Sequence, residues 1–290
     1  MGENSKIEWC HHTWNPWRGC TKVSSGCAHC YAEKLSHRNP RSLGIWGDNG
    51  SRAVGSESYW REPFKWNQQA QSERVRRRVF CGSLMDAAED RPELEPLRER
   101  MKETVEAAHW LDWLLLSKRP ENYSRMFWDV WPENAWAGTS AEDDETFRRR
   151  TSYLMRVKAV VRFVSCEPMI GRIDIPAGVL RSGDMVIVGG ESGRGARAMN
   201  PEWVRWMRDT CSAWGIPFFF KQWGEWAWAP DDLNYGDATK YLKDRFGKHV
   251  EIEFHSDGRT SARVGKERAG RLLDGREWNQ FPDPKRRGCA

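Results

Sequence analysis

Three cysteines stand close together near the start of the chain. Cys20, Cys27 and Cys30 have the spacing C-x6-C-x2-C, and a glycine precedes each of the first two. Glycines let a loop wrap closely around an inorganic centre, and the close pair supplies two thiolates to one site. Eight cysteines in 290 residues are too few and too unevenly spread for a disulfide framework, so this crowding indicates a metal centre.

Three thiolates without an obvious fourth ligand predict an iron–sulfur centre. A [4Fe–4S] cluster on Cys20, Cys27 and Cys30 leaves one iron open to an outside molecule. In radical chemistry that molecule is S-adenosylmethionine, whose reductive cleavage yields a 5′-deoxyadenosyl radical. The competing interpretation is a zinc site, although a second close pair of ligands is absent. Its fourth ligand would be a nearby cysteine or histidine: Cys10, His11, His12, His29 or His37.

Six segments share one form, an apolar run that ends abruptly in small or polar residues. They are 79–83, 113–118, 135–140, 161–167, 185–191 and 216–222, and 6–10 is a further candidate for an opening strand. Each is typical of a buried parallel strand with polar side chains at its carboxyl end. Helical signals lie between them, such as the helix formers of 94–110 and the cap Asn200 before Pro201. The sequence therefore predicts an α/β fold, a full or partial (β/α) barrel with six to seven parallel strands, and a doubly wound sheet is the competing form.

Polar residues at the strand ends are expected to converge, because ligands of such barrels gather there. These residues are Ser83, Asp86, Lys118, Arg119, Ser140, Glu167, Glu191 and Lys221. Glu167 and Glu191 follow buried runs directly and are the better candidates for carboxylates that face a ligand. Lys221 is expected either to contact a substrate or to extend into solvent. For each of these residues the alternative is a hydrogen bond that caps a strand or helix.

Two regions depart from the alternation of strands and helices. Residues 36–78 contain Gly, Ser, Asn and Arg with scattered tryptophans, and we expect a long loop or lid there. From residue 225 onward the chain has Gly-Asp and Asp-Gly turns and a predicted hairpin at 250–260. We therefore expect a barrel over 1–224, including the cysteine loop 19–31, and a C-terminal appendage over 225–290 that packs on it.

Composition and charge limit the location of the protein and the classes of molecule that it can bind. The longest apolar stretch, 111–116, contains Asp112 and is far shorter than the roughly 20 residues needed to cross a bilayer. Since residues 1–6 lack the apolar core of a secretory signal, the expected location is the cytoplasm. The net charge of +5 permits a phosphate-bearing partner. The arginine runs 74–78 and 148–150 are expected to be solvated faces, which together with the aromatics of 36–78 would suit a nucleic-acid groove.

Several longer motifs resemble a known family. The run 13–33, TWNPWRGCTKVSSGCAHCYAE, resembles an uncharacterised phage-encoded three-cysteine family, which itself resembles radical S-adenosylmethionine enzymes. The similarity also covers 116–122, 165–168, 188–193, 219–224, 265–266 and 272–276, and so spans nearly the whole chain. The usual spacing of the radical enzymes is C-x3-C-x2-C, whereas this chain has three more residues between its first two cysteines.

The resemblance implies an S-adenosylmethionine site at the strand ends. The methionyl amino group would be met by Gly82, Ser83 and Asp86. The ribose or the carboxylate would be met by Lys118 and Ser140, and the adenine by Gly189 and Gly190. The expected catalytic groups are Glu167, Glu191 and Lys221.

The expected function is a radical S-adenosylmethionine enzyme, reduced by a partner protein, that abstracts hydrogen from an unactivated carbon. The phage setting implied by the resemblance places it in the host cytoplasm and favours a DNA or nucleotide substrate, such as a modified thymine. Two alternatives stay open. A zinc-stabilised nucleic-acid-binding protein would have a fourth protein ligand beside the cysteines. A metal-dependent nuclease would use a carboxylate cluster, for which the candidates are Asp86, Glu142, Glu167 and Glu191.

Overall fold

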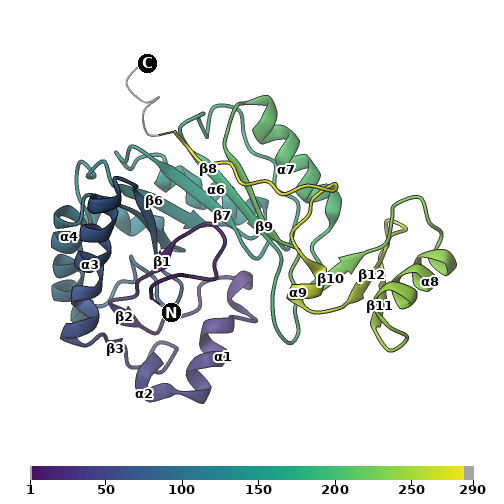
Figure 1. Ribbon diagram of the computed structural model, residues 1–290, viewed down its shortest axis with the longest axis horizontal. Helices are drawn as coiled ribbons and strands as arrows, with labels where there is room; N and C mark the ends of the chain where they lie inside the picture. Colours follow the sequence, from purple (N-terminus) through teal and green to yellow (C-terminus); the bar gives the residue numbers. More distant parts are fainter. Residues whose placement is uncertain (1, 284–290) are drawn as a thin grey trace.

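A curled parallel sheet forms the centre of the molecule (Figure 1). The computed structural model describes residues 2–283; the rest of the predicted appendage, 284–290, lies outside the described residues. The seven strands run in the order β1 (His12–Thr13), β4 (Arg77–Cys81), β5 (Leu111–Ser117), β6 (Ala135–Ser140), β7 (Arg162–Cys166), β8 (Met185–Gly189) and β9 (Phe218–Gln222). All neighbouring pairs are parallel. The predicted partial (β/α) barrel is confirmed, but the opening strand lies at 12–13 and not at 6–10.

Helices pack against the outer face of the sheet through the larger apolar core. The main ones are α3 (Glu57–Glu73), α4 (Glu95–Ala107), α6 (Asp144–Leu154) and α7 (Pro201–Ala213). The short helices η2 (Pro92–Leu94), η3 (Pro120–Asn122) and α5 (Tyr123–Met126) lie in the connections. The predicted N-cap of α7 is confirmed, because the Asn200 side chain accepts a hydrogen bond of 2.9 Å from the Glu202 amide.

The segment 36–78 is not the predicted uninterrupted loop. It contains the end of α1 (Tyr31–Arg38), the short α2 (Pro40–Leu43), and β3 (Ala53–Val54), which pairs with β2 (Trp17–Arg18). The 17-residue α3 then covers β4 and β5, with Trp60, Trp66 and Ala70 buried. Helix α3 thus supplies the helix between β1 and β4 that the loop interpretation omitted.

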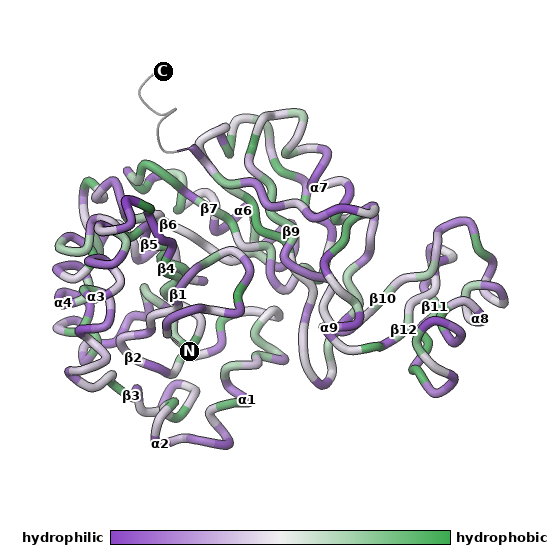
Figure 2. Tube along the Cα trace, viewed as in Figure 1, coloured by the Kyte–Doolittle hydropathy of each residue, from purple (hydrophilic) through white to green (hydrophobic). Residues whose placement is uncertain are grey.

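The inner face of the half-barrel has an apolar floor beneath a polar rim. The floor is an inner apolar cluster whose buried members include Trp9, Phe80, Leu114, Phe163 and Phe219. Residues two positions further along a strand point to the same side, so Ser165 and Lys221 follow on the inner face toward the carboxyl ends. In Figure 2 hydrophobic residues are concentrated in these central strands. The floor therefore leaves the strand ends as the polar part of the concave face.

A small antiparallel sheet projects from the barrel beside α7 (Figure 1). Its order is β10 (Trp226–Trp228), β12 (Thr260–Arg263) and β11 (Glu251–Phe254), and α8 (Tyr235–Phe246) packs on β12. The predicted hairpin at 250–260 is confirmed as β11 and β12. After α9 (Lys266–Ala269) the chain returns to β9, where Phe281 joins the inner apolar cluster. Within residues 2–283 no helix is long and apolar enough to span a membrane.

Candidate metal and cofactor site

A cavity of about 860 Å³ lies at the carboxyl ends of the strands. This volume is within the range of small-molecule and cofactor sites. The three cysteines line it together with most of the predicted site residues: Gly82, Ser83, Asp86, Lys118, Ser140, Glu167, Gly190, Glu191 and Lys221. Gly189 is not among the lining residues; a side chain there would lie 3.3 Å from the Glu167 carboxyl group.

Local structure presents the three cysteines in different ways. Cys20 follows Gly19, whose φ of +112° suits glycine and whose amide donates to the Leu84 carbonyl at 2.9 Å. Cys27 ends the short 3₁₀ helix η1 (Ser25–Cys27), and Cys30 is the residue before α1. All seven described cysteines are free thiols. The loop therefore offers three soft sulfur ligands to one cavity, a donor set that fits an iron–sulfur centre.

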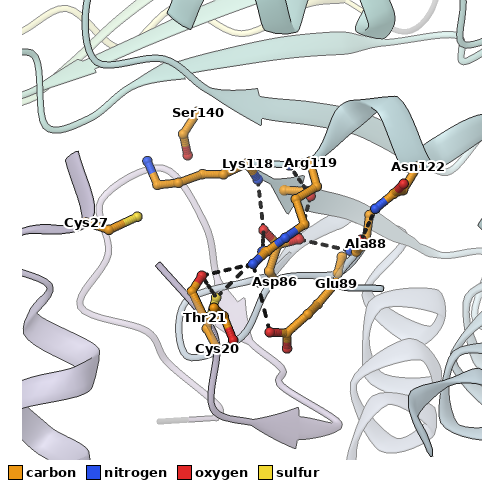
Figure 3. A network of polar contacts seen from close by, with 12 residues as sticks. Cys20, Thr21, Cys27, Asp86, Ala88, Glu89, Lys118, Arg119, Asn122 and Ser140 are labelled. Carbon is orange, nitrogen blue, oxygen red and sulfur yellow. Dashed lines mark hydrogen bonds and ion pairs between the residues drawn. The ribbon is translucent and has the colours of Figure 1, made fainter. Parts of the chain in front are cut away.

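Arg119 ties the Cys20 end of the loop to the strand ends (Figure 3). Its guanidinium lies 3.9 Å from the Cys20 sulfur, donates to the Thr21 carbonyl at 2.9 Å and binds Asp86 at 2.8 Å. Burial raises the pKa of the Cys20 thiol, and Asp86 adds to this effect, whereas Arg119 opposes it. Arg119 thus places a positive charge where a thiolate would form.

A second guanidinium, that of Arg52, closes this network. It binds Glu89 through two nitrogens at 2.8 and 2.7 Å and donates to the Thr21 hydroxyl at 3.0 Å. Both side chains of the Arg52–Glu89 pair are almost fully buried, at 2% and 3% exposure. Arg52 also binds carbonyls of the 45–50 segment, so this segment and the cysteine loop are held together.

Glu142 holds the other end of the loop. Its fully buried carboxylate accepts hydrogen bonds from Ser24 at 2.6 Å, Lys118 at 2.6 Å and Arg150 at 2.8 Å. Burial raises the pKa of Glu142, but Lys118 and Arg150 outweigh it and hold the pKa at about 2. A side chain at Gly26 would lie 2.1 Å from Glu142, so glycine permits this close approach. The prediction that 148–150 is a solvated face is wrong for Arg150, which is 2% exposed because it pairs with Glu142.

Asp86 is fully engaged by the protein. It accepts hydrogen bonds from the Ser117 hydroxyl, the Lys118 amide at 3.0 Å and the Ala88 amide at 3.0 Å, in addition to Arg119. Its carboxylate therefore organises the ends of β4 and β5. The expected contact of Asp86 with a methionyl amino group stays a prediction.

The two predicted catalytic carboxylates each have a cationic partner. Glu167 forms an ion pair with Lys221, and this pair connects the ends of β7 and β9. Glu191 accepts hydrogen bonds from the Arg197 guanidinium at 2.8 and 2.7 Å. Burial raises the pKa of Glu191, but the bonds from Arg197 lower it below its usual value. Between these pairs, a side chain at Gly190 would lie 2.1 Å from the Trp223 carbonyl, so packing of the protein itself demands this glycine.

The zinc alternative needs a fourth ligand, and its candidates have other contacts. The ring of His11 accepts a hydrogen bond from the Arg78 amide at 2.8 Å, and His12 stacks on Trp66 at 4.5 Å. Cys10 lies in the inner apolar cluster, His29 lies against Gly195, and His37 is exposed. In the described part of the chain no three His, Cys, Asp or Glu side chains are arranged to hold one metal ion, and this includes Cys20, Cys27 and Cys30 themselves.

Sequence reasoning missed four charged residues around the site: Arg52, Glu89, Arg150 and Arg197. None of them follows a strand directly. Their sequence neighbourhoods resemble ordinary charged surface, and only their partners across the fold distinguish them.

Comparisons with known proteins give a family and one distant likeness. No curated protein matches this sequence. A solved structure of a mutant spore photoproduct lyase, with bound AdoMet and dinucleoside spore photoproduct, is similar at 9% identity and a TM-score of 0.44, covering 91% of this chain and 73% of that chain. The model of DUF5131, described as a protein of unknown function, matches residues 4–282, and the chain belongs to that family.

Proposed function

We propose that this chain is a radical S-adenosylmethionine enzyme with a [4Fe–4S] cluster on Cys20, Cys27 and Cys30. The observation that supports it is that three free thiols of one loop and the polar strand ends line the same 860 Å³ cavity. A cluster held by these cysteines would supply one electron for the reductive cleavage of S-adenosylmethionine to methionine and a 5′-deoxyadenosyl radical.

The residues of the chain hold and enclose the reactants. Arg119 and Glu142 fix the two ends of the cysteine loop against the strand ends. The apolar floor, which includes Trp9 and Phe80, keeps water from the inner side of the cavity, as a reactive radical requires. Ser83, Lys118 and Ser140 are the proposed contacts of S-adenosylmethionine.

Lys221 is the proposed catalytic residue on the substrate side. Its ammonium group lies in the cavity wall and is oriented by the ion pair with Glu167. It can donate a hydrogen bond to a carbonyl oxygen of a nucleobase. The substrate class we propose is a base of phage DNA, such as a modified thymine that is rearranged or elaborated.

Anaerobic purification tests the cluster. We expect brown protein with about four irons per chain and broad visible absorption, because thiolate-to-iron charge transfer is absent for zinc. Reduction in the presence of S-adenosylmethionine should release 5′-deoxyadenosine. Alanine at Cys20, Cys27 or Cys30 should remove the iron, whereas Cys211→Ala, which alters a buried thiol of α7, should keep it. One tightly bound zinc per chain and no iron would establish the alternative.

A second experiment tests the substrate. The reduced enzyme is incubated with S-adenosylmethionine and phage DNA, which is then digested to nucleosides for mass spectrometry. We expect a nucleoside of changed mass with the wild type, and none with Lys221→Met although that variant keeps its iron. Unchanged nucleosides in the wild-type reaction would dismiss DNA as the substrate.

A further inference from the structure

The solvent-facing part of the cavity wall is basic. Eight cations line the cavity, and none of them is fully buried. Three of them, Lys118, Arg119 and Lys221, pair with carboxylates at or near the strand ends. The other five lie away from the strand ends: Lys6, Lys22, Lys34, Arg38 and Lys266. The five come from the N-terminal segment, the cysteine loop, α1 and α9, whereas the buried Asp86 and Glu191 lie at the strand ends, so we take the five as the solvent-facing opening. Of the carboxylates that line the cavity in the described residues, Glu3 is exposed, and the partly exposed Glu167 is paired with Lys221. The opening therefore carries a net positive charge.

Three of these cations are available to an outside anion. Lys22 pairs with Glu33 at 2.7 Å, and Lys266 lies 3.6 Å from Glu8. Within residues 2–283, by contrast, Lys6, Lys34 and Arg38 form no ion pair, and Lys34 donates only to a backbone carbonyl, that of Arg194, at 2.7 Å. We call these three residues the basic mouth.

An aromatic ring accompanies the basic mouth. Tyr31, Lys34 and Arg38 follow one another at helical spacing on α1, so they share the face that lines the cavity. Tyr31 as a whole residue is 47% exposed, and its hydroxyl donates a hydrogen bond to the Ser83 carbonyl at 2.7 Å. A fixed aromatic face beside unpaired cations suits nucleic acid, whose bases stack while its phosphates bind the cations. An acidic peptide would need the cations alone.

The arrangement also favours a strand over a single nucleotide. Lys34 and Arg38 are about 6 Å apart along the helix axis, and Lys6 comes from the separate N-terminal segment. Cations spread over two segments match repeated phosphates better than one phosphate. Since the strand-end residues proposed for the chemistry line a cavity, a base must leave a stacked duplex to reach them.

We infer that the basic mouth binds the phosphate backbone of a single DNA strand whose base enters the cavity. The inference rests on the proposed function, because it assigns the polymer that carries the reacting base. It adds Lys6, Lys34 and Arg38 as residues that bind the strand, with Tyr31 as the stacking surface.

Fluorescence anisotropy with a labelled thymidine-rich single strand of about 12 nucleotides tests this surface on the iron-loaded protein. We expect binding that weakens with salt. The double variant Lys34→Gln with Arg38→Gln should bind roughly tenfold more weakly, and its salt slope should fall by about 1.4, because each lost phosphate contact removes about 0.7. The control carries the same charge change on exposed residues of the appendage, Lys240→Gln with Lys248→Gln, and should bind like the wild type.

Several outcomes would overturn the inference. Equal losses of affinity in the two double variants would show that only the net charge of the protein matters for binding. If thymidine monophosphate displaces the labelled strand as well as an unlabelled strand does, the site binds a mononucleotide. If polyglutamate displaces it equally well, the partner is an acidic protein. Cleavage of S-adenosylmethionine by the wild type without DNA is measured in parallel. If cleavage occurs and the strand does not bind, this inference alone fails; if the strand binds and no cleavage occurs, the enzyme proposal fails.

Discussion

The two ends of the cysteine loop are held by networks of different construction. At Cys20 two guanidinium groups, those of Arg52 and Arg119, bind two carboxylates, Asp86 and Glu89. Near Cys27 a single carboxylate, that of Glu142, collects all its partners, and one of them, Lys118, is 20% exposed. Both networks border the cavity, but the side chains of the first are at most 12% exposed, whereas Lys118 leaves the second more open to solvent. We therefore expect the first to matter most for folding and the second to respond to pH.

Removing a guanidinium from the closed network should have the largest effect. Arg52→Ala leaves the Glu89 carboxylate buried without its main partner, which costs about 3–5 kcal/mol. The measurement is the free energy of unfolding in urea. Arg125→Ala, which breaks the exposed pair with Asp90, is the control and should change stability little. Similar losses in both variants would contradict the importance of burial at the Cys20 end.

Acid should weaken the Glu142 network. The pKa of Glu142 is about 2 in the folded chain and 4.5 as its ordinary value, so the unfolded chain takes up the proton first as pH falls. The contribution of this carboxylate, about 3 kcal/mol, is fully present above pH 4.5 and is lost as the pH falls toward 2. The free energy of unfolding is measured at pH 7 and at pH 3. Its decrease between these two values should be larger for the wild type than for Glu142→Gln. Parallel pH profiles would refute this assignment.

A methyl group at the Cys27 end should disturb the loop moderately. Gly26→Ala puts a carbon 2.1 Å from the tightly held Glu142 side chain, and overpacking of this kind costs about 1–3 kcal/mol. We expect lower stability and less iron after reconstitution. Gly183→Ala is the matched control, because nothing lies within 4 Å of its added carbon. Full iron content in Gly26→Ala would show that the loop does not need this contact.

Two hydroxyl deletions should have the smallest effects and compare the ends directly. Thr21→Val removes the hydroxyl that Arg52 binds, and Ser24→Ala removes the one that binds Glu142. Each should cost about 1 kcal/mol, because Arg52 and Glu142 keep their other partners. Urea unfolding and iron content are measured for both. A loss in either variant as large as that of Arg52→Ala would reverse the proposed order.

Much of the sheet could be predicted because a buried parallel strand has a recognisable pattern of apolar residues within a short segment of sequence. The runs that became β4 to β9 each contain consecutive buried apolar residues followed by small or polar ones, since both faces of the sheet are covered. Helix α3 was missed although its buried residues Trp60, Pro63, Trp66 and Ala70 follow one another at steps of three, three and four residues behind the cap Ser56. Pro63 inside the helix and the polar residues before it concealed that periodicity.

The sequence by itself determined the parallel sheet and the three candidate metal ligands, because the signals for both lie within short segments. Only the tertiary structure decided which charges surround those ligands. Arg150 follows two arginines that face outward, and nothing local distinguishes it; it is buried because Glu142 of the preceding loop needs a counter-charge. Such pairings depend on which strand ends, distant in sequence, lie next to each other in the fold. Local patterns of apolar and polar residues do not contain this information.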